Sequence, residues 1–268
     1  MANLSSNQAL YDYVAELIPT AVDTQDDGII IEAFRLNDIR HVCQAIRNIH
    51  TNEVEYQHLT LRFGGNCEQS VYNFTLSEDM ALCLDIYSLY LAVKHITFQL
   101  DTFHPDVIND LVVPIQAETL HWPQGHTFIE QLYRHHQKAM RHIIPCLQLH
   151  TANLDQGILS NNLASLQKKA PSLWIDIHTP TEYLPFLEQC RPDAIKISQK
   201  LQEKENKSGL LPVIKFIRKH NIQFIAGRIA SKNELMHFKL LGATYYFGYI
   251  SDIPTSTFKK IIHLISDT

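Results

Sequence analysis

The sequence predicts a closed barrel of alternating strands and helices, of the (β/α)8 type, with a less regular amino-terminal half. In the carboxyl-terminal half, short apolar segments alternate with amphipathic segments of roughly 10–15 residues, a pattern typical of a parallel sheet. The chain has 268 residues, a length that one such barrel often reaches. No stretch rich in Pro, Gly or Ser divides it, so we expect a single domain over residues 1–268.

The amino-terminal half shows mixed signals. Residues 26–36 are expected to form a buried strand and residues 36–50 an amphipathic helix. Residues 55–66 and 68–76 look like a hairpin with Gly64 and Gly65 near its turn, and we interpret it as an insertion into the barrel.

From Ser77 onward the elements are easier to assign. Residues 77–100 predict a long helix capped by Ser77, residues 109–120 a buried strand, and residues 127–142 a helix. Further strands are expected within residues 146–153, 172–179, 193–198, 222–227 and 243–251. Further helices are expected within residues 161–171, 181–190, 209–221, 231–242 and 255–265.

Composition excludes several classes of protein. With 23 basic and 28 acidic residues the net charge is −5, which argues against binding to nucleic acid or to anionic membranes. The five cysteines are scattered, as in proteins of a reducing compartment. The amino terminus lacks the basic start and apolar run of a signal peptide. The longest apolar segment, residues 80–98, contains Asp85 and Lys94 and is interpreted as a core helix, so we expect a cytoplasmic protein.

The segment FIAGRIASKNELMHFKLLGATYYFGYISDIP, residues 224–254, resembles the closing block of EAL domains, typically "AEGVE…L…LG…QGY…P". Ile18-Pro19 stands where the family has Gln-Pro, and Glu32-Ala33-Phe34 where it has Glu-Ala-Leu, with the family's separation of 13 residues between Pro19 and Glu32. Residues 195–198 look like the family's "KID" strand end. The resemblance implies a (β/α)8-type barrel. Many members hydrolyse cyclic di-GMP with divalent metals, Mg or Mn.

The resemblance also identifies positions that differ from the family pattern. The family residues that hold metals correspond here to Glu32, Gln116, His150 and Asp176, and the family lysine is Lys196; we regard these as vestigial active-site positions. The residues that stand in place of the family's ligand-binding or catalytic groups are Ile18, Leu36, Ile177, Gly227, Ala230 and Phe247.

These replacements remove carboxylates where the family places them. Two cations about 3.5–4 Å apart need flanking carboxylates to offset their repulsion. Ile177, Gly227 and Ala230 supply none, so we expect no phosphodiesterase activity and no cofactor.

The remaining polar residues allow two interpretations. Glu32, His150 and Asp176 could hold a single metal ion, or they could be hydrogen-bonded polar residues at a barrel mouth. Lys196 could be a catalytic lysine, but a buried ammonium group needs a partner, which favours an ion pair with Asp176 or Glu32.

Three functions remain open at this level. The leading one is an inactive EAL-like regulatory protein that acts through contact with a protein partner, in motility, pilus or biofilm control by analogy with the bacterial family, and forms a possible homodimer. The second is a receptor that binds cyclic di-GMP without hydrolysis, which Ile18 and Leu36 disfavour. The third is a single-metal phosphoesterase with a remodelled site.

Overall fold

A computed structural model describes residues 4–149, 156–177, 184–198 and 204–256 of the chain. The strands in these residues are β1 (Arg40–Asn48), β2 (Val54–Phe63), β3 (Gln69–Ser70), β4 (Asp110–Gln116), β5 (Ile143–Leu149), β6 (Trp174–Ile177), β7 (Ala194–Ile197), β8 (Gln223–Ala226), β9 (Tyr245–Tyr246) and β10 (Thr255–Ser256). The α-helices are α1 (Asn7–Leu17), α2 (Gln25–Arg35), α3 (Glu78–Thr102), α4 (Pro123–His135), α5 (Gln137–Met140), α6 (Gln156–Gln167), α7 (Leu184–Cys190), α8 (Lys204–His220) and α9 (Lys232–Leu241). Short 3-10 helices are η1 (Ile18–Ala21), η2 (Val71–Asn73), η3 (Pro105–Val107) and η4 (Ala117–Leu120).

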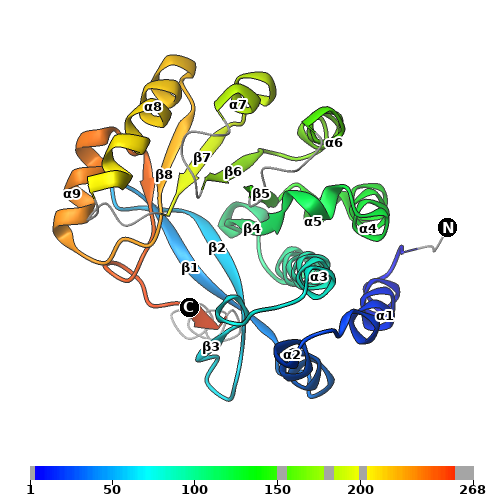
Figure 1. Ribbon diagram of the computed structural model, residues 1–268. Helices are drawn as coiled ribbons and strands as arrows, with labels where there is room; N and C mark the ends of the chain where they lie inside the picture. Colours follow the sequence, from blue (N-terminus) through cyan, green and yellow to red (C-terminus); the bar gives the residue numbers. More distant parts are fainter. Residues whose placement is uncertain (1–3, 150–155, 178–183, 199–203, 257–268) are drawn as a thin grey trace.

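The sheet closes into a barrel, seen along its axis in Figure 1. Strands β2, β4, β5, β6, β7, β8 and β9 follow one another in parallel, and β1 joins β2 to β9 with antiparallel pairing on both sides. The predicted (β/α)8-type barrel is therefore confirmed, with β1 as its one reversed strand among the described residues.

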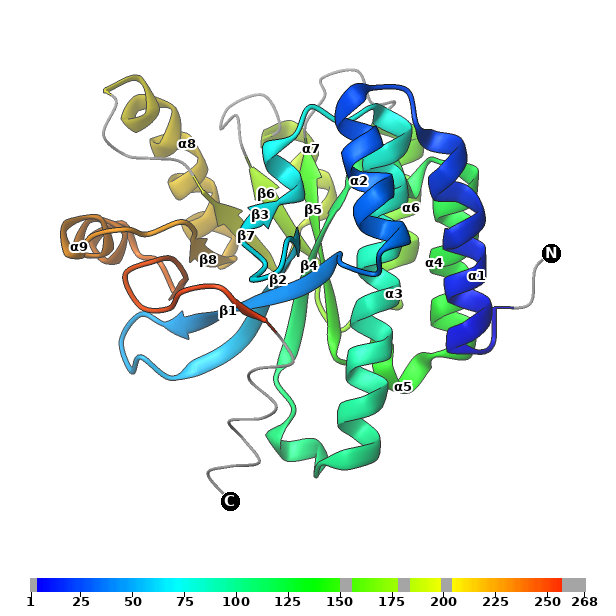
Figure 2. The same cartoon turned by 90° about the horizontal axis from the view of Figure 1, so that it is seen from below.

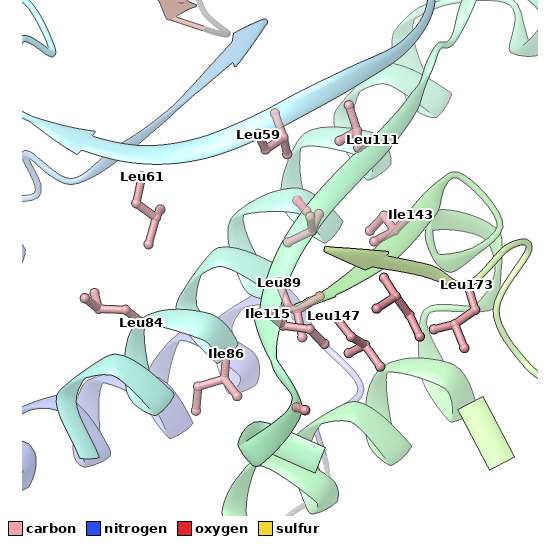
Figure 3. Packing of buried hydrophobic residues seen from close by; sticks show 14 of the residues in the cluster. Leu59, Leu61, Leu84, Ile86, Leu89, Leu111, Ile115, Ile143, Leu147 and Leu173 are labelled. Atoms are coloured by element: carbon pink, nitrogen blue, oxygen red, sulfur yellow. The ribbon is translucent and has the colours of Figure 1, made fainter. Parts of the chain in front are cut away.

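Side chains of the barrel strands divide between two hydrophobic clusters, because successive residues of a strand point to opposite faces. The barrel interior holds Ile46, Val112, Ile144, Cys146, Trp174, Ala194, Ile225 and Phe247. The larger cluster lies between the strands and the surrounding helices. Figure 3 shows part of it, with Leu59 and Leu61 of β2 facing the same core as Leu84 of α3 and Leu147 of β5.

Helix α3 is the central helix of the outer layer around the amino-terminal half, and α1 packs against it (Figure 2). The side chain of Ser77 accepts a hydrogen bond from the amide of Met80, so the predicted cap of this helix is confirmed. By length and composition α3 could cross a membrane, but 67% of its most apolar window is buried inside the molecule. It is packed between the barrel strands and other helices of the outer layer.

Two predictions for the amino-terminal half are wrong. Residues 26–36, expected as a strand, form most of α2, and residues 36–50, expected as a helix, contain β1. Thr24 and Asp27 form a reciprocal capping box that starts α2, and Asp27, Ile30, Ile31 and Phe34 then follow the helical spacing of its buried face. The apolar run Ile29–Ile31 suits a strand by propensity alone, but the cap and the packing decide for a helix.

The structure also differs from the predicted hairpin insertion. β2 and β3 do pair, but only through Arg62 with Ser70 and Phe63 with Gln69. β2 itself is a full barrel strand, and its long antiparallel partner is β1. At the other end, Thr255 and Ser256 pair with β1 as β10 where a helix was expected, and residues 257–268 lie outside the described residues.

Candidate ligand site at the barrel mouth

The carboxyl ends of β6 and β7 bring together two of the polar residues that were predicted from sequence, Asp176 and Lys196. Asp176 and Lys196 are paired in register and are 1% and 3% exposed. The Lys196 Nζ lies 2.8 Å from Asp176 Oδ2, so the predicted ion pair is confirmed with Asp176 as the partner. Burial alone favours a neutral amine, but the Asp176 carboxylate outweighs it and raises the pKa of Lys196. The ammonium group is therefore charged.

His58 of β2 also contacts this lysine. The His58 Nε2 lies 3.2 Å from Lys196 Nζ, and the imidazole ring stacks on Phe247 with a centroid separation of 4.6 Å. Burial, with smaller contributions from Lys196 and Arg228, holds the pKa of His58 well below its usual value. A neutral imidazole can accept a hydrogen bond from the ammonium group, so His58, Lys196 and Asp176 form a buried polar chain.

The turn after β8 is filled by neighbouring side chains. A Cβ atom added at Gly227 would lie 2.4 Å from Ser198 Oγ and 3.0 Å from the Phe247 ring. Arg228 has a φ of 58°, in the left-handed region that disfavours most side chains. The space beside Gly227 therefore belongs to Ser198 and Phe247, and a larger residue there requires both to move. Ala230, the other replaced position in this turn, is exposed.

Glu32 does not lie at a strand end of the barrel mouth, where it was expected. Glu32 lies in α2 outside the barrel, its side chain is 63% exposed, and it forms an ion pair with Arg35 at 2.7 Å. Leu36 follows that helix and is 77% exposed, whereas Ile18 is fully buried in η1. None of the three lies on a barrel strand, because the first strand begins at Arg40.

The barrel strand that precedes β4 is β2, and counting along it gives a different correspondence. Ala45 and His58 have the same 13-residue separation as Pro19 and Glu32. The residue before Ala45 is Gln44, and the residue four places after His58 is Arg62. Gln44, His58 and Arg62 therefore fit the same spacing that was matched to Ile18, Glu32 and Leu36. The signal that could have found them is this spacing, applied to a β1–β2 hairpin.

Gln44 and Arg62 both face the mouth side of the barrel. Gln44 is the register partner of His58, and its Nε2 donates to the Asp252 carbonyl at 2.7 Å. Within the described part of the chain, the two terminal nitrogens of Arg62 make only long hydrogen bonds, of 3.4 Å to the Cys67 carbonyl and 3.5 Å to the Tyr249 hydroxyl. Its Nε is buried and has no hydrogen-bond partner among the described residues. Arg62 thus has donor capacity that its neighbours among the described residues do not use.

Of the remaining predicted positions, Gln116 and Ile177 lie within the described residues. Gln116 ends β4, and its backbone amide donates to Asp85 at 2.7 Å. Gln148, which sequence reasoning missed, is in register with both Gln116 and Asp176. Ile177 is buried in the outer core, and His150 lies outside the described residues.

The described side chains do not suit a metal ion. No group of three or more His, Cys, Asp or Glu side chains gathers anywhere in the described ranges. Glu32 and Asp176, two of the three predicted ligands, belong to different layers of the fold. Asp176 already contacts the ammonium of Lys196, which places a positive charge where a cation would need to be.

Comparison with known proteins connects this geometry to one fold. No family model and no curated protein matches the chain. Among solved structures, a phosphodiesterase named PaMucR in complex with c-di-GMP is similar with a TM-score of 0.73 and 17% identity, over 88% of this chain and 100% of that one. The YkuI protein of Bacillus subtilis, with an EAL domain in complex with substrate c-di-GMP and calcium, has a TM-score of 0.70 and 19% identity, over 85% of this chain and 57% of that one. A standalone EAL protein of Vibrio cholerae O395, bound to c-di-GMP, has a TM-score of 0.62 and 17% identity, over 82% and 96%.

At these identities the similarity shows the EAL-type barrel fold. It also contradicts two predictions. The prediction that the chain is not an enzyme is wrong by this comparison, because the similar structures include a phosphodiesterase and EAL enzymes, and no finding shows loss of activity. The prediction against cyclic di-GMP binding is contradicted as well, since several of those structures hold c-di-GMP.

Proposed function

We propose that this chain is an EAL-type protein that binds cyclic di-GMP at the carboxyl mouth of its barrel, in bacterial signalling. The observation that carries the proposal is the arrangement of Arg62, whose Nε is buried without a partner in the described residues and whose other bonds are long. A guanidinium group with unused donors binds most strongly to a ligand that accepts two of its hydrogen bonds at once. A phosphate group is such a ligand.

The charges around the mouth suit a phosphodiester. Lys196 is already neutralised by Asp176, while Arg62 and the exposed Arg228 stand nearby without such a pairing in the described residues. Cyclic di-GMP carries two phosphodiester groups, each with one negative charge. The two arginines therefore offer charge of the right sign for the ligand, although the chain as a whole is acidic with a net charge of −5.

An aromatic ring next to Arg62 supports recognition of a base. Tyr249 is 61% exposed, and its hydroxyl accepts the long hydrogen bond from Arg62 Nη2. An exposed aromatic face beside a phosphate-binding arginine is suited to stacking on a guanine ring. In this proposal the whole chain acts as one domain, since its outer core includes residues from Leu4 to Tyr246.

Action through a protein partner is a second candidate. The observation that favours it is the outer face of α9, where Met236 is 55% exposed and Leu240 is 75% exposed, one helical turn apart. The single-metal phosphoesterase has no such support, because the described donors do not gather around one point.

Isothermal titration calorimetry with cyclic di-GMP tests the proposal. We expect saturable binding by the unmodified chain and a loss of roughly 10- to 100-fold for Arg62→Ala, the effect of removing a charged hydrogen-bond donor. Arg35→Ala is the matched control, since Arg35 is an exposed arginine of α2 away from the mouth. Absence of binding, or an equal loss in both variants with unchanged circular dichroism, contradicts the proposal. Chromatography of the same samples after incubation with Mg²⁺ or Mn²⁺ reports whether the ligand is hydrolysed.

A further inference from the structure

A groove lies at the end of the barrel opposite the mouth. It has a volume of about 400 Å³ and is formed where α4 ends and α5 leads into β5, with Lys169 after α6 on its other side. Its main lining residues are Glu130, Tyr133, Arg134, Met140, Arg141 and Lys169. Because β5 begins just after α5, the groove is at the amino-terminal end of the strands, away from the mouth that holds Arg62.

The charge of this groove is opposite to that of the chain. Three basic residues and one acidic residue line it, whereas the chain carries −5. Lys169 Nζ is bonded to Glu130 Oε1 at 2.5 Å, which neutralises those two groups. In the part of the chain that the structure describes, neither the Arg134 nor the Arg141 guanidinium has an ion pair or a side-chain hydrogen bond, and both residues are exposed. Two free positive charges therefore face one groove.

The floor of the groove adds a donor and an apolar wall. The Tyr133 hydroxyl is buried and has no hydrogen-bond partner among the described residues. Burial, and then Glu130, raise the pKa of Tyr133, so the phenol remains a donor at all physiological pH values. Met140 is 3% exposed beside it. A smaller cavity of about 20 Å³ borders the groove at Tyr133 and is lined by Ile129 and Leu166.

We propose that this groove binds a small organic molecule that carries a phosphate monoester. Two unpaired guanidinium groups suit a dianionic phosphate because each can donate two parallel hydrogen bonds. The unsatisfied Tyr133 hydroxyl supplies a further donor, and the apolar wall suits the organic part of the ligand. The volume is within the range of roughly 300–1,000 Å³ that small-molecule sites occupy. The site is separate from the proposed cyclic di-GMP site and does not depend on it.

Phenyl phosphate is a suitable probe, followed by NMR titration of the full chain. We expect saturable binding that is at least about tenfold tighter than that of inorganic phosphate, because the ring contacts the apolar wall, and no saturable binding of benzyl alcohol. Arg141→Ala is expected to weaken phenyl phosphate binding about tenfold or more, and Tyr133→Phe, which removes only the hydroxyl, roughly three- to tenfold.

Matched controls separate this site from general electrostatics and from the barrel mouth. Lys138→Ala removes a positive charge from α5, the helix that Arg141 directly follows. Lys138 is exposed and does not line the groove, so this variant should leave the affinity for phenyl phosphate unchanged. Arg62→Ala should also leave it unchanged. No saturation by phenyl phosphate, an equal loss with Lys138→Ala, or full affinity in Arg141→Ala overturns the proposal. Tighter binding of phosphate-bearing vesicles than of phenyl phosphate would overturn it in favour of a membrane surface.

Discussion

At the scale of single residues, the barrel mouth is organised around the ammonium group of Lys196. It contacts Asp176 on one side and His58 on the other, and its Nζ lies 5.6 Å from the centre of the Phe247 ring. All of these side chains are buried. A buried ion pair adds little net stability compared with apolar residues, but a single buried charge without its partner is strongly unfavourable.

Lys196→Met should therefore destabilise the fold more than most surface substitutions. The change leaves the Asp176 carboxylate buried without its cation, and we expect a loss of roughly 3–5 kcal/mol in the free energy of unfolding. Urea denaturation measures it. The double variant Lys196→Met, Asp176→Asn removes both charges and should recover part of the loss. A single variant that loses less than about 1 kcal/mol would show that the pair is not buried as described.

The same residues show what sequence reasoning could reach. Asp176 and Lys196 lie on short strands of the regular half, where each strand ends at the same edge of the sheet, so their proximity followed from strand assignment. His58, Gln44 and Arg62 were missed because the 13-residue spacing was matched only to an earlier segment of the chain. Two copies of a 13-residue separation fit the family pattern, and only the strand assignment distinguishes them.

At the scale of elements, the amino-terminal half was assigned incorrectly because local signals compete there. Residues 29–31 are three isoleucines, which favour a strand by propensity, yet a capping box and helical spacing place them in α2. β1 is buried on both faces over much of its length, from His41 to Cys43 and at Ala45 and Ile46, so it lacks the alternation of a half-exposed strand. Such a segment cannot be distinguished from a buried helix by periodicity.

Asp85 of α3 connects the outer helix layer to the mouth. Its Oδ2 accepts hydrogen bonds from the backbone amide of Gln116 at 2.7 Å and from the Thr119 hydroxyl at 2.6 Å. Burial is the main cause that raises the pKa of Asp85 to about 7, and the two hydrogen bonds oppose it in part. The position of Gln116 at the end of β4 thus depends on a carboxyl group that prefers to be protonated.

Asp85→Asn should increase the stability of the fold, and the increase should depend on pH. A carboxyl group whose pKa is raised on folding stabilises the protein fully below its unfolded pKa and loses that contribution as pH rises through about 7. Asparagine accepts the same hydrogen bonds without ionising. Relative to the unmodified chain, the variant should therefore become more stable by about 2–3 kcal/mol between pH 5 and pH 8. Thermal denaturation at both pH values measures this. A difference that does not change with pH would contradict the raised pKa.

At the scale of the whole molecule, closure of the barrel depends on the short pairing between β1 and β9, called the seam below. β1 pairs with β2 over eight register positions but with β9 only through Arg47 with Tyr246 and Asn48 with Tyr245. Closure of the sheet therefore rests on few backbone hydrogen bonds at this point, and side chains add to them. This closure could be expected from the fold class, but the sequence does not indicate where the seam lies, because the contacts join residues about 200 positions apart.

Asp252 is one of the side chains that strengthen this seam, and its removal should open the barrel locally. Arg47 donates to it through Nε at 2.8 Å and through Nη2 at 2.9 Å, and the carbonyl of Asp252 accepts from Gln44. For Asp252→Ala we expect a loss of roughly 1–3 kcal/mol, since the pair is half-buried and bidentate. Hydrogen exchange should become faster for the amides of β1 and β9 than for those of β5 and β6, because the seam can then separate while the parallel strands stay paired. Asp106→Ala, at an aspartate with an 88% exposed side chain, is the control. Equal protection of β1 in both variants would mean that Asp252 does not strengthen this closure.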